Sequence, residues 1–395
     1  MRIHRPAAPS DEAPAWLAFV AGGTSRALED LSPADWTAAL TIAERGGVLP
    51  ALAARLRATG ASRLLPDALQ PRLDDVERST AVSTLSNQRA FVQVARALDS
   101  IGVPVVPYKG IDLAHAVYPE PGMRPMKDVD LWVRAEELPT AMEALACVGI
   151  VERHTSQRVA RYERAWDGEA QLQRRDGQPF GAELHLGPFP GEWLHRAARI
   201  DRAAVWGRLQ PGELLGHGVR RLANEDHALE VALHAVINEQ LTRVQLRQLL
   251  DLTMLVRAGL DADALVERAR DWRVARATGF ACTLAGALYA DETVAALGER
   301  LMARAPRGLL PRHWGLPTTG SLLRGEHLSD RQHARFVYQL RVADDAAAVV
   351  RLGTHGLWPD ADWLEARYGA SDARTRWRHL VWLAHPRRTP PTGDR

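Results

Sequence analysis

The chain has 395 residues, of which 46% are hydrophobic and 25% are charged, a composition typical of folded globular proteins. Disorder along the whole chain is therefore excluded, and no stretch reaches the ~18 consecutive apolar residues of a membrane-spanning helix. The net charge of +2 is too small to indicate nucleic-acid binding by itself. Two cysteines cannot form a disulfide framework, and the first residues lack the apolar segment of a secretory signal, so we expect a cytoplasmic protein.

The first hundred residues are predicted to form a flexible arm followed by helices. Residues 1–14 are rich in proline, alanine and charge, which is typical of a loose terminus. Ser32, with a proline directly after it, is typical of a helix start, and the glycines Gly46 and Gly47 predict where that helix ends. Because apolar residues recur at helical spacing up to residue 100, we expect an N-terminal helical region at 15–100.

Short β-rich segments alternate with helical ones between residues 101 and 190. Strands are predicted at 103–108 and 129–133, and two or three more within 151–186, of which 182–186 is the clearest. Helices are predicted at 111–118 and 136–147. This alternation predicts a small sheet domain at 101–190, the core of the protein.

Helical spacing returns after Gly191. We predict a helical region at 191–300, a C-terminal helical region at 301–384 and a disordered tail at 385–395. The segment from Gly216 to Gly218 is expected to be a loop within this region. Helical segments are expected at 224–236, 246–258, 262–270, 275–289 and 334–350, with a Trp- and Arg-rich stretch at 363–382. The predicted fold class is thus α+β, a small mixed sheet flanked by helices with helical regions at both ends.

Several common catalytic signatures are absent from the sequence. There is no phosphate-binding P-loop, no His-Glu-x-x-His zinc motif, no Gly-x-Ser-x-Gly nucleophile turn and no dinucleotide-binding glycine fingerprint. The chemistry must therefore be sought in other residues.

The strongest candidate site is the pair Asp128 and Asp130. In an extended strand, residues two apart point to the same face, so both carboxylates project together. Two like charges at this spacing repel unless a cation compensates them, and hard oxygen ligands suit Mg²⁺. Glu183, in a second alternating strand, could supply a third carboxylate within roughly 4–6 Å of the aspartates if two metal ions are shared. The alternative is that these acids are ordinary solvent-facing residues of surface strands.

Lysine use points to the same segment of the chain. Only two of the 50 basic residues are lysines, Lys109 and Lys127, and both lie close to the two aspartates in sequence. Lys109 and Gly110 fall where a strand turns into a helix, where a lysine and free backbone amides could hold phosphates. Arg124 and Lys127 could bind the same anion. Taken singly, each of these basic residues could instead be a solvated surface charge.

The order of these motifs resembles a known superfamily. Tyr108-Lys-Gly110 and Arg124-Pro-Met-Lys-Asp-Val-Asp-Leu-Trp-Val133 are similar to nucleotidyltransferases with the DNA polymerase β-like fold. The closer resemblance is to a bacterial family of uncharacterised nucleotidyltransferases, whose pattern is Leu-Lys-Gly followed by Arg-Pro-x-x-Asp-x-Asp-Leu-Leu-Val. It extends to Glu183-Leu-His185 and to helical segments at 233–235 and 246–251, and covers roughly residues 33–290.

The resemblance implies a function and a division of roles. Asp128, Asp130 and Glu183 would carry the metal, Mg²⁺ with Mn²⁺ as the alternative, and Lys109 and Gly110 would hold the nucleotide phosphates. The enzyme would move a nucleoside monophosphate from an NTP, with ATP the first choice, to an acceptor that could be a peptide, a protein, RNA or a small molecule. The alternative is a non-catalytic nucleotide-binding or scaffold protein with the same fold.

Residues outside the sheet domain have simpler interpretations. His234 is expected to be a core histidine on an apolar helix, and Arg247 and Asp251 are expected to form an i,i+4 ion pair. The sequence leaves open whether these three residues or His185 line a cleft. Trp363, Trp377 and Trp382 could stack on nucleic acid, although a helical packing face is the simpler interpretation.

Overall fold

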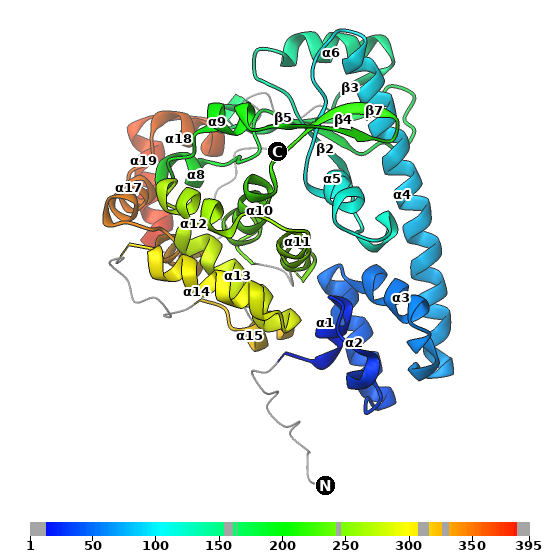
Figure 1. Cartoon of the computed structure of the whole chain (residues 1–395). Coiled ribbons are helices and arrows are strands. Elements are labelled where there is room, and N and C mark those ends of the chain that lie inside the picture. The colour runs from blue at the N-terminus through cyan, green and yellow to red at the C-terminus, as the bar shows by residue number, and fades with distance from the viewer. Residues whose placement is uncertain are drawn as a thin grey trace.

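The structure is a computed structural model that describes residues 13–153, 161–162, 164–241, 246–306, 316–325 and 332–384. It confirms the α+β class, because a five-stranded mixed sheet lies among many helices, with helical regions toward both ends of the chain (Figure 1). The predicted tail at 385–395 and nearly all of the predicted arm at 1–14 lie outside the described residues. The division of the chain into domains stays a prediction.

The N-terminal helices form as their capping residues predict. They are α1 (Ala15–Val20), α2 (Pro33–Gly46), α3 (Leu49–Ala58) and the long α4 (Gln70–Asp99). The Ser32 hydroxyl accepts a hydrogen bond from the Asp35 amide at 3.2 Å, while the Asp35 carboxylate accepts one from the Ser32 amide at 3.0 Å. Gly47, with φ of 73°, ends α2. Figure 1 shows α4 running along one side of the molecule from these helices to the sheet.

The sheet has the strand order β1-β2-β5-β4-β3. The strands are β1 (Val106–Pro107), β2 (Val129–Trp132), β3 (Ile150–Glu152), β4 (Glu169–Arg174) and β5 (Ala182–His185). Strands β2 and β5 are parallel neighbours, and every other pair in this sheet is antiparallel. Strand β1 is much shorter than the predicted 103–108, since Pro104 and Pro107 have no amide hydrogen to donate to a ladder.

One face of the sheet is apolar and the other is polar. Val129 and Leu131 of β2 and Leu184 of β5 are fully buried in a cluster with residues of α4 and of α6 (Leu138–Cys147). Because side chains alternate along a strand, the residues between them, Asp130 and Glu183, face the other side. Helix α5 (Lys109–Ala116) follows β1 and begins two residues earlier than predicted.

The region at 191–300, predicted to be helical, also contains two strands that were not predicted from the sequence. Strands β6 (Gln210–Leu214) and β7 (His217–Arg221) form an antiparallel hairpin. Leu215 and Gly216 at its tip both have positive φ, as a tight two-residue hairpin turn requires. The predicted loop is this tip together with the start of β7. The Arg220 amide donates to the Val105 carbonyl at 2.8 Å, which attaches the hairpin beside β1.

A series of α-helices follows Gly191 and extends to residue 304. They are α8 (Glu192–Ala197), α9 (Arg202–Gly207), α10 (Asn224–Leu233), α11 (Leu246–Arg257), α12 (Ala262–Asp271), α13 (Ala275–Tyr289) and α14 (Glu292–Arg304). Helix α10 continues directly into a π-helical turn, η5 (His234–Asn238). Helix α13 has the predicted bounds.

The C-terminal region consists of shorter helices than predicted. They are α15 (Thr319–Arg324), α16 (Gln332–Arg341), α17 (Ala346–Leu357), α18 (Ala361–Tyr368) and α19 (Ala373–Ala384). The expected segment at 334–350 is broken because Asp345 caps α17 through the Ala348 amide, while the buried Asp344 accepts the first two amides of α13. The stretch at 363–382 is broken at Gly369, whose φ is 83°.

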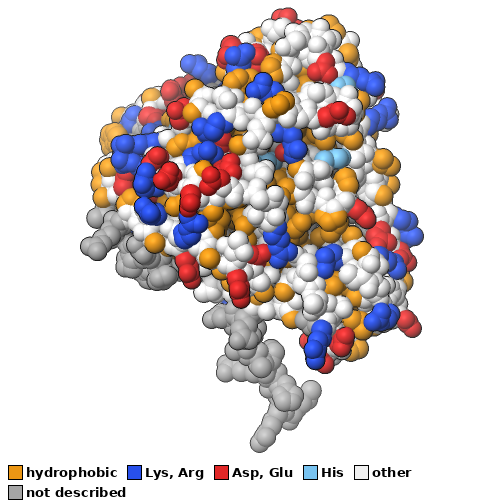
Figure 2. Space-filling model, in the orientation of Figure 1, with side chains coloured by type: hydrophobic (Ala, Val, Ile, Leu, Met, Phe, Trp, Pro, Cys, Tyr) orange, Lys and Arg blue, Asp and Glu red, His pale blue; other side chains and the backbone are white. Residues whose placement is uncertain are grey.

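The tryptophans of this region differ in their surroundings. Trp363 contacts the ring of His379 at 5.2 Å and the guanidinium of Arg367 at 5.1 Å, as a packing face predicts. Trp377 does not pack in this way, since it is 67% exposed. Over the face drawn in Figure 2, acidic and basic side chains are interspersed. Within the described ranges, no helix combines the length and apolar character needed to cross a membrane.

Candidate active site

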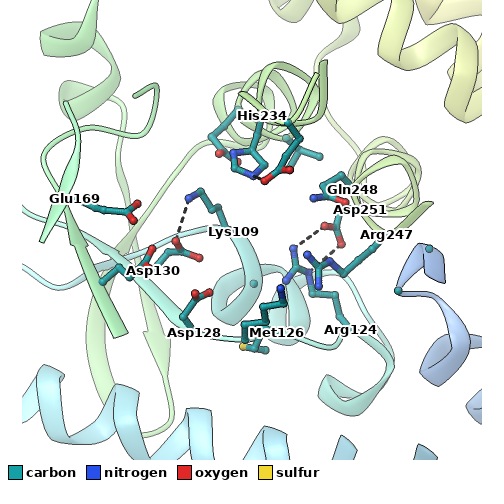
Figure 3. A pocket seen from close by; sticks show the side chains of 18 of the residues that line it. Lys109, Arg124, Met126, Asp128, Asp130, Glu169, His234, Arg247, Gln248 and Asp251 are labelled. Atoms are coloured by element: carbon teal, nitrogen blue, oxygen red, sulfur yellow. Dashed lines mark hydrogen bonds and ion pairs between the residues drawn. The ribbon is translucent and has the colours of Figure 1, made fainter. Parts of the chain in front are cut away.

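A pocket of about 520 Å³ lies on the polar side of the sheet. Its walls come from the C-terminal end of α2, from the strands and the start of α5, and from α10 and α11 (Figure 3). These segments lie far apart in sequence, so the pocket depends on the packing of the whole chain. All seven site residues predicted from the sequence line this pocket: Lys109, Gly110, Arg124, Lys127, Asp128, Asp130 and Glu183.

The register of β2 and β5 brings the predicted acids together. Asp130 lies directly opposite Glu183 in the parallel pair, so both side chains leave the sheet on the pocket side. His185, two residues farther along β5, donates from Nε2 to the Asp130 carboxylate at 2.8 Å, and the same nitrogen lies 3.5 Å from the Glu183 carboxylate. One ligand atom from each of Asp130, Glu183 and His185 lies within 4.8 Å of the others, so these three residues could hold one metal ion.

Asp128 sits beside this group but outside it. It precedes β2, is partly buried and lines the pocket, but it does not belong to the three clustered ligand residues. Burial, and then the charge of Asp130, raise the pKa of Asp128. This is the repulsion between paired carboxylates that a bound cation would relieve.

Lys109 is already paired with a carboxylate. Its ammonium lies 3.0 Å from the Asp130 carboxylate, and its side chain is only 15% exposed (Figure 3). Burial opposes the charge of Lys109, but Asp130 outweighs it and raises the pKa of the lysine. For Asp130, burial is likewise outweighed by Lys109 and His185, which lower the pKa of the carboxyl. In this structure the lysine therefore neutralises an acid of the site.

The backbone at Lys109 is held in an unusual conformation. Its φ is 51°, in the left-handed region, and its amide donates to Nε2 of His227 at 3.2 Å. His227 Nδ1 faces Asp112 at 3.5 Å, and Asp112 is bound by the Arg221 guanidinium at 2.7 and 3.2 Å. Burial lowers the pKa of His227 to about 4, so the ring is neutral and can accept this hydrogen bond. The hairpin strand β7 thus helps to fix Lys109.

Gly110 has a packing role at the start of α5. A side-chain carbon at this position would lie 2.6 Å from the Arg124 guanidinium and 3.0 Å from Met126 Cβ. The close approach of α5 to the 124–126 segment therefore requires glycine. Because the Lys109 amide is already bonded to His227, fewer amides of this helix start are free than the sequence suggests.

The expected ion pair between Arg247 and Asp251 is wrong. Asp251 is fully buried and accepts two hydrogen bonds from the Arg124 guanidinium, at 3.1 and 2.8 Å, and a third from the Tyr118 hydroxyl at 2.7 Å. The bidentate geometry and burial make Arg124 the better partner. Arg247 instead donates to the Pro125 carbonyl at 3.1 Å. Figure 3 shows both arginines and Asp251 at the end of the pocket away from Glu169 and Asp130.

Four polar residues of the site were not assigned from the sequence. Glu169 on β4 lies 3.6 Å from His185 Nδ1, and both Glu230 and His234 line the pocket from α10 and η5. The alternation in Glu183-Leu-His185 is a signal that could have placed His185 beside the acids. Nothing local marks Glu169 or Glu230, because their roles follow from strand pairing and helix packing.

Glu230 and His234 form an uncharged part of the wall. Burial raises the pKa of Glu230 to about 8 against the opposing effect of Lys109, so the carboxyl is largely protonated at neutral pH. Burial, and then Lys109, lower the pKa of His234 to about 3. Glu230 Oε2 and His234 Nδ1 are buried and have no hydrogen-bond partner among the described residues. The expected core histidine is therefore also a pocket residue.

A mixed sheet that presents an Asp-x-Asp strand and a neighbouring glutamate to a polar pocket has the architecture expected of a nucleotidyltransferase. The family described as uncharacterised nucleotidyltransferases matches residues 32–290, about two thirds of the chain. The chain belongs to this family, as the sequence motifs predicted. A comparison with curated proteins finds no match.

Proposed function

We propose that the protein transfers a nucleoside monophosphate from an NTP to an acceptor and releases pyrophosphate. The observation that carries this proposal is the opposed pair Asp130 and Glu183 on adjacent parallel strands, at the floor of a pocket in a chain of the nucleotidyltransferase family. ATP is the proposed donor, and a peptide, a protein, RNA or a small molecule is the acceptor. The two cysteines, neither of which is in a disulfide, support a cytoplasmic location.

The donor atoms of the site fit a divalent cation. The carboxylates of Asp128, Asp130 and Glu183 are hard oxygen ligands suited to Mg²⁺, and His185 adds a nitrogen that Mn²⁺ also accepts. A bound cation supplies Lewis-acid stabilisation of the charge on the phosphates. A cation at Asp130 competes with the Lys109 ammonium, so we expect Lys109 to turn toward the phosphates when the site is loaded.

The protein groups around the cation would orient the reactants and move a proton. The acceptor oxygen attacks the α-phosphorus, the bond from that phosphorus to the bridging oxygen of the β-phosphate breaks, and pyrophosphate leaves. Glu183, 15% exposed and beside Asp130, is the proposed acceptor of the proton that the attacking hydroxyl loses. Lys109, Gly110, Arg124 and Lys127 remain the sequence-based candidates for contact with the nucleotide.

The test is incubation of the full chain with each labelled NTP, Mg²⁺ or Mn²⁺, and a cell extract, followed by identification of the labelled species. Release of pyrophosphate together with one labelled acceptor is the expected result, and Asp128→Asn is the inactive control. Binding of NTP without transfer to any component would favour the alternative, a nucleotide-binding or scaffold protein. A chain that binds no NTP with either metal would contradict both.

A further inference from the structure

More basic side chains line the pocket than are paired with a carboxylate. Lys109 is neutralised by Asp130, and Arg124 by Asp251. Among the described residues, no carboxylate pairs with the other basic residues that line the pocket, Arg45, Lys127 and Arg247. The pocket therefore has an acidic end at the strands and a basic end at α11 and the 124–127 segment, as Figure 3 shows for the labelled residues.

Arg247 is the most enclosed of these three cations. Arg45 and Lys127 are exposed, whereas Arg247 is partly buried and its Nε has no hydrogen-bond partner within the described part of the chain. Its Nη1 donates to the Pro125 carbonyl at 3.1 Å, a contact that orients the guanidinium without pairing it with a carboxylate. Burial, and then the nearby charge of Arg124, lower the pKa of Arg247. An enclosed guanidinium beside a second one is costly unless an anion joins them.

We infer that Arg247, with Lys127, holds the β- and γ-phosphates of the NTP, so that the triphosphate runs from the acids of β2 and β5 toward α11. This inference rests on the proposed function and adds the direction of the bound nucleotide. A guanidinium can donate two parallel hydrogen bonds to a phosphate. The Nε–H of Arg247 has no partner among the described residues and is available for such a bond. At the opposite end of the pocket Glu169, Glu183 and the two aspartates repel phosphate oxygens unless a cation lies between them.

The direction has a consequence for the acceptor. Pyrophosphate would leave at the Arg247 end, so the attacking group must approach from the side of Glu169 and Glu183, because displacement at phosphorus is in line. The acidic lining of that side disfavours an acceptor whose attacking hydroxyl is flanked by phosphates or carboxylates.

The test is titration of the full chain with ATP, ADP, AMP and inorganic triphosphate in the presence of Mg²⁺, by calorimetry. Arg247→Gln should weaken ATP and inorganic triphosphate by roughly 10- to 100-fold, the range of one lost charge-assisted contact, and AMP by less than about twofold. Arg247→Lys should recover part of the loss. Arg257→Gln is the matched control, because Arg257 lies on the same helix but pairs with Asp291 away from the pocket.

The outcomes separate this inference from the proposed function. The inference is overturned, while the proposed function stands, if the parent protein binds ATP and Arg247→Gln lowers the affinities for ATP and AMP equally. It is also overturned if Arg247→Gln changes neither affinity. If the parent binds no nucleotide with Mg²⁺ or Mn²⁺, the proposed function itself fails. Thermal melting of each variant without ligand shows whether it is folded. If Arg247→Gln is not folded, Arg247→Lys is compared with the parent instead, and it must then show the same selective loss of affinity for ATP and inorganic triphosphate.

Discussion

Asp130 is the residue on which most interactions of the pocket converge. Its carboxylate contacts both Lys109 and His185, and its side chain is 8% exposed. A carboxylate held in this way serves stability as well as chemistry, since its removal leaves two buried basic groups without compensation. Asp128 makes no such contacts, so the two aspartates can be separated experimentally.

Replacing each aspartate by asparagine should therefore give different results. Asp128→Asn is expected to abolish metal-dependent transfer with a stability change within about 0.5 kcal/mol, as for other surface-type substitutions. Asp130→Asn should abolish transfer and also cost about 3 kcal/mol, because the Lys109 ammonium loses its partner. Transfer assays and urea unfolding of both variants provide the measurements, and turnover retained in Asp128→Asn would remove it from the metal site.

The lysine at position 109 should not tolerate arginine. The Lys109 ammonium lies between Asp130 and the ring of Tyr108, 5.0 Å away, and a larger planar guanidinium does not reproduce both contacts. We expect Lys109→Arg to weaken NTP binding and to lower stability as well, since the side chain is not an exposed charge. Lys127→Arg is the comparison, and it should tolerate the exchange better, because an exposed guanidinium can still reach a phosphate. Equal NTP affinity in both variants would show that the lysines are incidental.

The raised pKa of Glu230 predicts how the stability of the protein depends on pH. Its pKa is about 4.5 in an unfolded chain and about 8 in the folded one, so the folded state binds the proton more tightly. Stability from this group is present below about pH 4.5 and is lost as pH rises toward 8, by about 1.4 kcal/mol for each unit of the pKa difference. Glu230→Gln should reduce this loss. Urea unfolding at pH 6 and pH 8.5 without metal measures it, and parallel curves for both proteins would contradict it.

At the scale of elements, α13 and α14 pack through glycines. A side-chain carbon at Gly286 would lie 2.6 Å from the Ala295 amide nitrogen, and one at Gly298 would lie 2.8 Å from the Thr283 amide nitrogen. Backbone atoms cannot move aside as a flexible side chain can. The two helices can approach this closely only because neither position carries a side chain.

Alanine at Gly286 should consequently destabilise the protein even though alanine favours helices. The expected loss is about 1–3 kcal/mol, the usual cost of overpacking, after the helix preference is included. Gly353→Ala in α17 is the matched control, because nothing lies within 4 Å of that position and the backbone is helical. It should raise stability by about 0.5–1 kcal/mol. Thermal melting of the two variants should therefore give shifts of opposite sign.

The elements that were predicted correctly carry strong local signals. Ser32 and Gly47 fixed the ends of α2, and the two-residue alternation in β2 and β5 placed Asp130 and Glu183 on one face. The hairpin β6–β7 was missed because its strands contain glycines and charged residues instead of an apolar alternation. The pairing of Asp251 with Arg124 rather than Arg247 depends on residues 127 positions apart, which helical spacing cannot rank.

At the scale of the whole molecule, the main apolar cluster joins distant parts of the chain. It contains Leu40 from α2, Tyr108 beside the sheet, Leu249 from α11 and Tyr338 from α16. The regions that the sequence divides at residues 100, 190 and 300 therefore all contribute to this cluster, and a second cluster lies between the apolar face of the sheet, α4 and α6.

Calorimetry of the full chain should accordingly show one main unfolding transition. Mg²⁺ with ATP should raise its midpoint by a few degrees, since a ligand at 100 times its Kd stabilises the folded state by about 2.7 kcal/mol. The Asp128→Asn variant, melted under the same conditions, should lose most of this shift. Two well-separated transitions, one of them insensitive to ligand, would instead support independent domains.

At Lys109 the backbone preference and the ion pair with Asp130 have opposite effects on stability. A side chain in this conformation costs about 1 kcal/mol that glycine avoids, so Lys109→Gly relieves strain while it removes the ammonium from Asp130. Any procedure that ranks substitutions by backbone preference would favour glycine here and would discard the group that compensates the acids. Because breaking an enclosed ion pair costs about 3 kcal/mol, more than the strain, such a ranking would select a less stable protein with an altered pocket.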